Sequence, residues 1–528
     1  MHYELILVGL LATIAALAVV AHKSRVPYPI LLVLGGTAIG FVPAIPTIEL
    51  QPNVVLVIFL PPLLYAAALF VSVRELRRNL RPIGLLAIGL VLATTVGVAL
   101  AAHYLVGMGW PAAFVVGAIV SPTDSVAGGE ILRRLGVPRR ALTILEGESL
   151  TNDWTALVLY KFAIAAVVTG TFSLAEAGGQ FILTGVGGVA VGLAVGWVTK
   201  QVRARLDDPP TEITISLLTG YAAYLPAEQL GFSGVIAAVT VGLYMGWHAS
   251  RLTTATVRIQ TYAFWEVLQF LLNAFLFVLI GLQWPVVLAR LSDIPALRLV
   301  AYGLLISGLV VVIRVVWVFI LTYLPRLLSE QLRMRDPYPS PRVVMVIAWS
   351  GMRGAVSMAA ALAIPLAVAG GGPFPDRDLI VFLTFCVIAV TLVGQGLTLP
   401  LVIKLLRVER DDLDAREERY ARVHAARAAS RRIEELAEAE WTYDDTIERL
   451  RGLYEYRATR FELGPDHEKG AKLEARSQTY ARTLRELIEA QREVLIELRN
   501  SGTITDEVMR TVEHDLDLEE VRLSGESA

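Results

Sequence analysis

The sequence predicts an all-α, polytopic membrane protein of about thirteen transmembrane helices, followed by a partly helical C-terminal tail. Of the 528 residues, 55% are hydrophobic and 18% are charged, whereas a soluble chain carries roughly 25% charged residues. The charge balance changes near Arg407. Residues 1–406 hold 26 basic and 19 acidic side chains, and residues 407–528 hold 21 and 30. We therefore expect a membrane domain over 1–406 and an acidic tail over 407–528.

The membrane domain divides into apolar segments, each of about the 20 residues that a spanning helix needs. Thirteen candidates lie at 3–21, 28–43, 53–73, 82–106, 110–131, 141–169, 178–199, 211–226, 231–248, 261–284, 296–324, 342–369 and 379–405. The second, eighth and ninth are short or interrupted, which is typical of tilted, buried or re-entrant helices. All of these segments carry helical rather than strand-like lengths of apolar sequence.

Basic residues in the loops predict the orientation of these spans. Six alternate loops together hold 19 lysines and arginines, whereas the opposite loops hold only Arg290, Arg298 and Arg377. Because cytoplasmic loops carry the excess of basic residues, we expect the N-terminus outside and the tail in the cytoplasm. The protein is thus expected in a cell membrane, either an inner or a plasma membrane.

The fifth span contains the polar segment Ser121-Pro122-Thr123-Asp124-Ser125. An ionised side chain within a membrane costs about 2.5–3.5 kcal/mol on insertion scales, so a buried aspartate indicates a function. Pro122 removes a backbone donor and disturbs the preceding turn, which leaves carbonyl and hydroxyl oxygens as cation ligands beside Asp124. The alternative is a proline kink with an aspartate that caps a helix at a loop.

The sixth span contains Glu148-Ser149-Leu150-Thr151-Asn152-Asp153. Residues four apart share a helix face, so Glu148 stacks with Asn152 and Ser149 with Asp153. Hydroxyl, amide and carboxylate oxygens suit a small hard cation. Lys161, two turns beyond Asp153, can supply a counter-charge to a buried acid or extend to the interface. The alternative is an exposed helix start.

The twelfth span contains a basic residue between two glycines, in the segment Trp349-Ser350-Gly351-Met352-Arg353-Gly354. Glycines weaken a helix and permit close approach. Arg353 needs an anion, and we expect Glu148 to be its partner. Interrupted helices, one in each half of the chain, indicate a transporter site, although the ion pair alone could be structural. Arg314 and Glu266 are expected to serve packing or an interface.

These segments resemble the monovalent cation/proton antiporter family, which includes bacterial and archaeal sodium/proton antiporters and animal sodium/hydrogen exchangers. The resemblance covers about residues 5–406. Its matching positions are Leu60-Pro61-Pro62-Leu63-Leu64-Tyr65, Ser121 to Asp124, Glu148 to Asp153, Gly351-Met352-Arg353-Gly354, Asn273 and Gly281-Leu282. One position departs: several prokaryotic relatives carry a glutamate after the Pro-Pro-Leu-Leu segment, where this chain has Tyr65-Ala66-Ala67-Ala68.

The resemblance implies a thirteen-helix fold with inverted repeats, a dimerisation domain and a core domain that moves like an elevator. It implies a secondary transporter, not an enzyme, which exchanges Na+, or Li+ or K+, for H+ in pH and sodium homeostasis. Asp153 would bind cation or proton in turn, with Na+ held by Asp153, Asp124, Thr123 and Ser149. Asn152 would line the site, and Glu148 and Arg353 would support it. The Asn152-Asp153 pair resembles the electroneutral branch.

Other expectations complete this interpretation. We expect a homodimer in the lipid bilayer, no cofactor and no nucleic-acid partner. An ion channel and an intramembrane aspartyl protease, with Asp124 and Asp153 as its dyad, are the alternative classes. The tail has helical patterning over 416–436 and 480–498, broken by Gly464-Pro465-Asp466, and is expected either to regulate transport or to act as a solvated charged segment.

Overall fold

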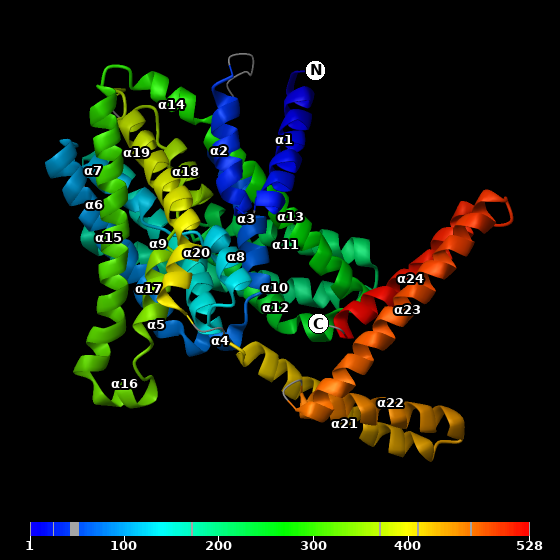
Figure 1. Cartoon of the computed structure of the whole chain (residues 1–528). Coiled ribbons are helices and arrows are strands. Elements are labelled where there is room, and N and C mark those ends of the chain that lie inside the picture. The colour runs from blue at the N-terminus through cyan, green and yellow to red at the C-terminus, as the bar shows by residue number, and fades with distance from the viewer. Residues whose placement is uncertain are drawn as a thin grey trace. The chain divides into compact units, whose positions relative to one another are not determined.

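The computed structural model describes residues 2–24, 26–42, 52–170, 173–368, 371–408, 411–464 and 467–526. Helices dominate these residues, and the only β-type pairing among them is a single bridge between Ala367 and Pro373. The chain separates into two compact units, Met1–Arg410 and Asp411–Ala528 (Figure 1). Three residues on which sequence expectations rest lie outside the described residues: Arg25, one of the 19 basic loop residues, and Pro465 and Asp466 of the expected break in the tail.

The first unit begins with a run of helices that leads to the central part of the chain. They are α1 (His2–Ser24), α2 (Tyr28–Gly40), α3 (Pro52–Leu69), α4 (Val73–Arg78), α5 (Leu80–Gly84), η1 (Leu85–Leu90), α6 (Val91–Ala101), η2 (Ala102–Val106), α7 (Trp110–Val120), α8 (Ser125–Leu135) and α9 (Arg139–Thr169). The π-helical segments η1 and η2 continue the helical path of α5 and α6 without a break.

The remaining helices of this unit follow α9. They are α10 (Leu174–Arg203), α11 (Pro209–Gln229), α12 (Gly234–Leu252), α13 (Ala255–Leu282), α14 (Trp284–Arg290), α15 (Ala296–Leu328), α16 (Glu330–Arg335), α17 (Pro341–Trp349), α18 (Ala355–Leu362), α19 (Arg377–Ala389), η3 (Val390–Gln395) and α20 (Gly396–Leu406). The prediction of an all-α membrane protein with two interrupted helices is confirmed. The interruptions separate α7 from α8 and α17 from α18.

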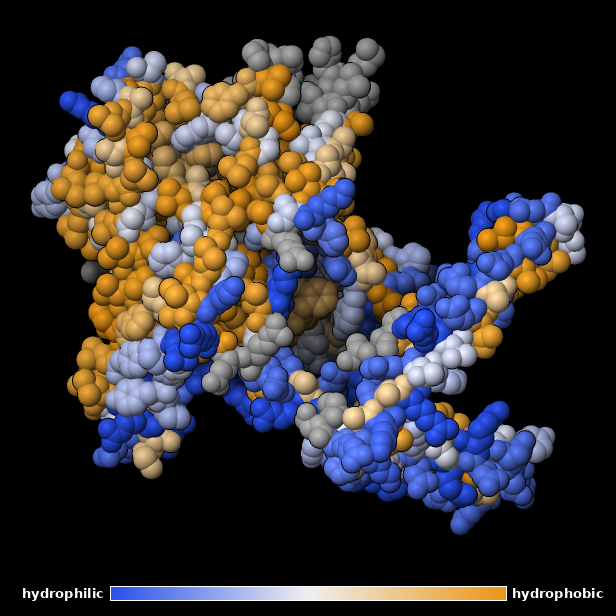
Figure 2. Space-filling model, in the orientation of Figure 1, coloured by the Kyte–Doolittle hydropathy of each residue, from blue (hydrophilic) through white to orange (hydrophobic). Residues whose placement is uncertain are grey.

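Several of these helices are long and apolar enough to cross a membrane by length and composition. Among the described residues they are Leu80–Val106, Ala175–Arg203, Ala255–Arg290, Ala296–Leu328 and Arg377–Leu406. Helices also occupy the other predicted segments, and the count of thirteen spans stays a prediction. Figure 2 shows hydrophobic side chains over most of the visible side of this unit, with hydrophilic ones gathered at the end that holds α16.

An apolar seam joins two groups of helices in the first unit. Its buried members from one group are Leu60, Leu64 and Ala68 of α3, Tyr224 of α11, and Val235, Ala238 and Val239 of α12. Leu150 of α9 faces them, with Val356 of α18 packed against the cluster. The seam therefore places α9 and α18, which carry site residues, beside α3, α11 and α12.

The second unit consists of α21 (Leu413–Ala437), α22 (Asp444–Leu463), α23 (Glu468–Asn500) and α24 (Asp506–Glu526). Its core between α23 and α24 contains Ala481, Ile488, Leu516 and Leu523. Arg492 of α23 forms ion pairs with Asp517 and Glu520 of α24, at 2.6 and 2.7 Å. The tail is thus a packed helical unit.

Candidate functional site

The two interrupted helices meet at their non-helical segments, 121–124 and 350–354. The Asp124 backbone N–H donates to the Met352 carbonyl at 2.8 Å. Gly354 lies so close that a Cβ atom there would fall 1.8 Å from Asp124 Oδ2. Glycine at 354 is therefore what allows the two segments to cross.

Asp124 and Arg353 occupy the helix ends that favour their charges. Asp124 caps the start of α8, since its Oδ1 accepts from the Val126 N–H at 2.8 Å. The fully buried Arg353 donates from Nε to the Val120 carbonyl at 3.1 Å, at the end of α7. An anion at a helix N-terminus and a cation at a C-terminus are both stabilised by the helix dipole. The two charges therefore stabilise the broken ends of α7 and α8, where the backbone N–H and C=O groups lack helical partners.

The expected pair between Glu148 and Arg353 is wrong, because Glu148 pairs with Arg314 of α15. Arg314 Nη2 lies 3.0 Å from Glu148 Oε2, and Nη1 lies 2.5 Å from Oε1. Arg314 also donates to the carbonyls of Ile347 and Ala348, near the end of α17. Arg314 is thus part of the site rather than a packing residue. A basic side chain in the middle of an apolar span was the signal, since it requires an acid.

Thr123 and Asn152 form a hydrogen-bonded connection between the crossing and α9. Thr123 Oγ1 donates to Glu148 Oε1 at 2.8 Å and accepts from Asn152 Nδ2 at 2.9 Å. Asn152 Nδ2 also lies 3.1 Å from the Thr123 carbonyl. The buried Asn152 Oδ1 has no hydrogen-bond partner among the described residues. The Thr123 hydroxyl oxygen, which has two lone pairs, keeps one of them for a ligand, and the Asn152 oxygen is also available.

Asp153 is a nearly buried carboxylate, 8% exposed, for which the described part of the chain provides no hydrogen bond or ion pair. Its neighbour one turn earlier, Ser149, accepts from the Ser125 N–H at 3.3 Å through Oγ. A buried charge is normally paired or bound to a metal ion. The arrangement leaves Asp153 free to take a proton or a cation.

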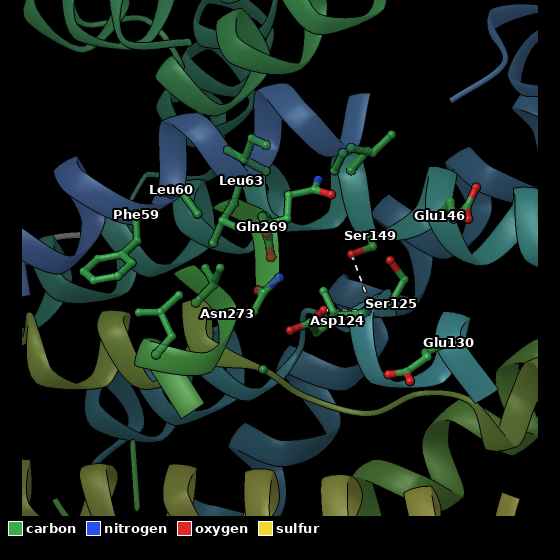
Figure 3. Close-up of a pocket in the computed structure, with 18 of the residues that line it drawn as sticks. Phe59, Leu60, Leu63, Asp124, Ser125, Glu130, Glu146, Ser149, Gln269 and Asn273 are labelled. Atoms are coloured by element: carbon green, nitrogen blue, oxygen red, sulfur yellow. Dashed lines mark hydrogen bonds between the residues drawn. The ribbon is translucent and has the colours of Figure 1, made fainter. Parts of the chain in front are cut away.

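A central cavity of about 670 Å³ reaches this carboxylate. One wall includes Asp124, Ser149 and Asp153. The opposite wall includes residues of α3 and α13, among them Phe59, Leu60, Leu63, Gln269 and Asn273 (Figure 3). Arg133 and Glu146, which form an ion pair, also line it near the turn from α8 to α9. The cavity therefore connects Asp153 with the end of the unit that holds this turn.

Two further acidic residues line the central cavity. Glu130 of α8 has a buried Oε2 without a hydrogen-bond partner among the described residues. Glu266 of α13, expected at an interface or in packing, instead faces the same cavity and is exposed. The sequence analysis did not assign a role to Glu130, which lies at the end of the fifth predicted span, close to the basic residues Arg133 and Arg134.

Lys161 lies apart from the buried acids. Its Nζ pairs with Glu228 of α11 at 3.1 Å, and its side chain is 65% exposed. The pair links the C-terminal half of α9 to α11. The structure thus brings together Thr123, Asp124, Glu148, Ser149, Asn152, Asp153 and Arg353, and leaves Lys161 outside this group.

The order of these motifs along the chain matches one protein family. The model of the sodium/hydrogen exchanger transmembrane family matches residues 9–405. The chain belongs to this family. Uncharacterised Na+/H+ exchangers of Mycobacterium tuberculosis and Mycobacterium bovis are 37% identical to this exchanger over 522 residues, which cover 98% of the chain and 96% of each relative.

Other relatives of this exchanger carry more specific names. The low-affinity Na+/H+ antiporter NhaS1 of Synechocystis is 36% identical over 432 residues, covering 81% of the chain and 78% of the relative. The solved sodium proton antiporter MjNhaP1 of Methanocaldococcus jannaschii superposes with a TM-score of 0.60 at 22% identity, covering 78% of this chain and 100% of that one. This second likeness shows that the fold is shared. The resemblance expected from the sequence is confirmed.

Proposed function

We propose that this exchanger is a secondary antiporter that moves one monovalent cation against one proton, with Asp153 binding each in turn. The observation that carries the proposal is Asp153 itself. It is a nearly buried carboxylate that lines the central cavity, one helical turn from Ser149, and it has no hydrogen bond or ion pair within the part of the chain that the structure describes. A carboxylate can bind either a proton or Na+, whereas an uncharged side chain at this position could not exchange one for the other.

Competition for one carboxylate provides the coupling. A proton occupies an oxygen lone pair of Asp153 that a cation also needs, so binding of one displaces the other. Exchange follows when the site changes sides only while Asp153 is occupied. Asp124, held at the start of α8 by the Val126 N–H, would remain charged throughout. Each cycle would then carry one positive charge in each direction and would be electroneutral.

The oxygens around Asp153 define a candidate cation site. Carboxylate oxygens of Asp153 and Asp124 and the Ser149 hydroxyl, which all line the cavity, would be its ligands. The buried Asn152 Oδ1, which has no hydrogen-bond partner among the described residues, is a further candidate. Thr123 lines the same cavity, and its hydroxyl orients Asn152 while keeping one lone pair, with which it would serve as the ligand expected from the sequence. The Glu148–Arg314 pair supports Thr123 in turn. Oxygen ligands of this kind suit Na+ or Li+ and accept K+ at longer distances.

The central cavity reaches Arg133, whose side chain is 65% exposed, and the end of the unit at which Arg133 lies is rich in basic residues in the sequence. By the positive-inside rule it is the cytoplasmic end, so this conformation faces inward. The same reasoning puts the N-terminus outside and the tail in the cytoplasm of a cell-membrane protein. A homodimer is proposed from the resemblance.

The function is tested with purified protein in liposomes that contain a lumenal pH dye. After a pH gradient is imposed, Na+, Li+, K+ or choline is added outside. We expect a pH change with Na+ that persists when valinomycin and K+ clamp the voltage. Folded Asp153→Asn protein should give no change above empty liposomes, because an amide does not bind and release a proton.

The matched control is Asp378→Asn, which removes an exposed carboxylate of α19 that lies outside the cavity and pairs with Arg290 at 3.6 Å. This variant should retain the response of the unmodified protein. Normal exchange in folded Asp153→Asn would overturn the role of Asp153. A current without coupled proton movement would instead identify a channel.

A further inference from the structure

A second, smaller cavity lies at the surface of the first unit, away from the transport site. It has a volume of about 330 Å³ and is lined by Arg74, Arg77, Arg78 and Trp247. The three arginines belong to α4, and Trp247 belongs to α12. In Figure 1 the labels of α4 and α12 lie near each other at the lower end of this unit. We call this cavity the arginine pocket.

The positive charge of the arginine pocket is poorly compensated. Arg74 and Arg77 have no ion pair among the described residues, and Arg78 makes only a 3.5 Å contact with Glu75. The Arg78 side chain is 68% exposed. Three arginines therefore line one cavity, and a single carboxylate, that of Glu75, pairs with one of them among the described residues. Such a group favours an anion.

The surroundings of the arginine pocket locate it at the boundary between lipid tails and headgroups. Leu80, at the start of the helix that follows α4, has an exposed side chain. Trp247, 59% exposed, lies near the end of α12, one turn before Arg251. Tryptophan is enriched at membrane interfaces, where its ring contacts apolar chains and its N–H faces water. An anion at this depth is most readily supplied by the membrane.

We propose that the arginine pocket binds the phosphodiester headgroup of an anionic phospholipid. Guanidinium groups bind phosphate oxygens through paired N–H donors, and the exposed indole of Trp247 packs against the glycerol and upper acyl chain. Basic pockets between transmembrane helices are known to recognise anionic headgroups in this way.

The position of α4 gives this lipid a structural role. Leu76 of α4 packs where a side chain at Gly147 of α9 would lie, and Asn79, just after α4, accepts from Arg140 of α9 at 3.1 Å. Trp247 lies on α12, across the apolar seam from α9. A bound headgroup would therefore contact both groups of helices that the seam joins.

Binding is tested by thermal unfolding of the purified full chain in detergent, titrated with phosphatidylglycerol, phosphatidylcholine or inorganic phosphate. A ligand that binds only the folded state raises the melting temperature. We expect phosphatidylglycerol to raise it at lower concentration than phosphatidylcholine. The Arg74→Gln/Arg77→Gln variant should need a roughly 25-fold higher phosphatidylglycerol concentration for half of the effect, about five-fold for each arginine.

The matched control is Arg333→Gln/Arg335→Gln, which removes two exposed arginines of α16 and should leave the phosphatidylglycerol titration unchanged. An equal loss in both double variants would mean unspecific attraction and would overturn the proposal. Stabilisation by inorganic phosphate at the same concentrations would assign the arginine pocket to a free anion and also overturn it. If the first variant does not fold, Trp247→Leu carries the test, and an unchanged titration there rejects the site. The readout does not depend on exchange.

Discussion

At the scale of single residues, two buried arginines make equivalent contacts, each with backbone carbonyls near the C-terminal end of an interrupted half-helix. Arg353 binds the Val120 carbonyl near the end of α7, and Arg314 binds the Ile347 and Ala348 carbonyls near the end of α17. Each places a cation at the negative end of a half-helix dipole. Of the two, Arg314 forms a direct ion pair among the described residues, with Glu148. The two arginines therefore stabilise the interrupted helices, and one of them also neutralises the site.

Removal of Arg314 should strongly destabilise the protein. In Arg314→Met, Glu148 would stay buried without its partner, a situation that costs about 3–5 kcal/mol. We expect a lower melting temperature in detergent, and partial recovery when Glu148→Leu is added to the same chain. The control Arg290→Gln breaks an exposed pair with Asp378 and should change stability little. An unchanged melting temperature in Arg314→Met would contradict the importance of the pair.

Asp336 gives a pH-dependent prediction outside the spans. Burial raises the pKa of its carboxyl, but hydrogen bonds and charges from Arg140 and Arg326 outweigh this effect and hold the pKa below its usual value. The stabilisation is therefore present above the usual aspartate pKa and is lost as pH falls through the lowered one. Asp336→Asn should lose on the order of 1 kcal/mol at pH 7.

The measurement is the difference in melting temperature between Asp336→Asn and the unmodified protein from pH 7 to pH 3. This difference should shrink as the pH falls. Glu330→Gln, on the neighbouring α16, breaks an exposed pair with Arg333 and should show little difference at any pH. A difference that stays constant down to pH 3 would show that the charge of Asp336 is not its cause.

At the scale of elements, the crossing of the two interrupted helices depends on Gly354. Its φ of −128° is accessible to any residue, so the backbone conformation does not require glycine. Space does, because a Cβ atom would overlap Asp124. Gly354→Ala should displace Asp124 and reduce exchange by about five- to 150-fold, through overpacking of roughly 1–3 kcal/mol.

The control for this prediction is Gly129→Ala in α8, where a Cβ atom would meet nothing within 4 Å. It should exchange cations at the normal rate in the liposome assay. If Gly354→Ala matched it, the close approach at the crossing would be unimportant for transport.

The sequence predicted both interruptions because their causes are local. Pro122, Asp124, Gly351 and Gly354 break apolar spans whatever surrounds them. The partner of Glu148 was predicted wrongly, because Arg314 and Arg353 lie in different spans and only tertiary packing decides which of them reaches the acid. The π-helical segments η1, η2 and η3 had no such local signal, since they contain no proline and no Asp, Glu, Lys or Arg that would interrupt a span.

At the scale of the whole molecule, the two units have separate cores. All candidate site residues belong to Met1–Arg410. A chain truncated after Arg410 should therefore fold in the membrane and exchange cations, with any change confined to rate or pH response. The liposome assay on the truncated and full chains checks this. Complete loss of exchange from folded truncated protein would show that the tail is part of the transport machinery.

The apolar seam between α9 and the α3, α11 and α12 helices has a mechanical consequence. Leu60, Leu64, Leu150 and Val239 meet there through dispersion contacts, which have no preferred direction. Hydrogen bonds, in contrast, hold the crossing, Thr123, Asn152 and Arg314 to one another. A shift of α9 along the seam would replace one apolar contact by another. The directional contacts that it would break are the exposed Lys161–Glu228 ion pair and the hydrogen bond from Trp154 to Thr184. The apolar seam would therefore oppose such a shift only weakly, and the hydrogen-bonded site would move along it as a rigid body.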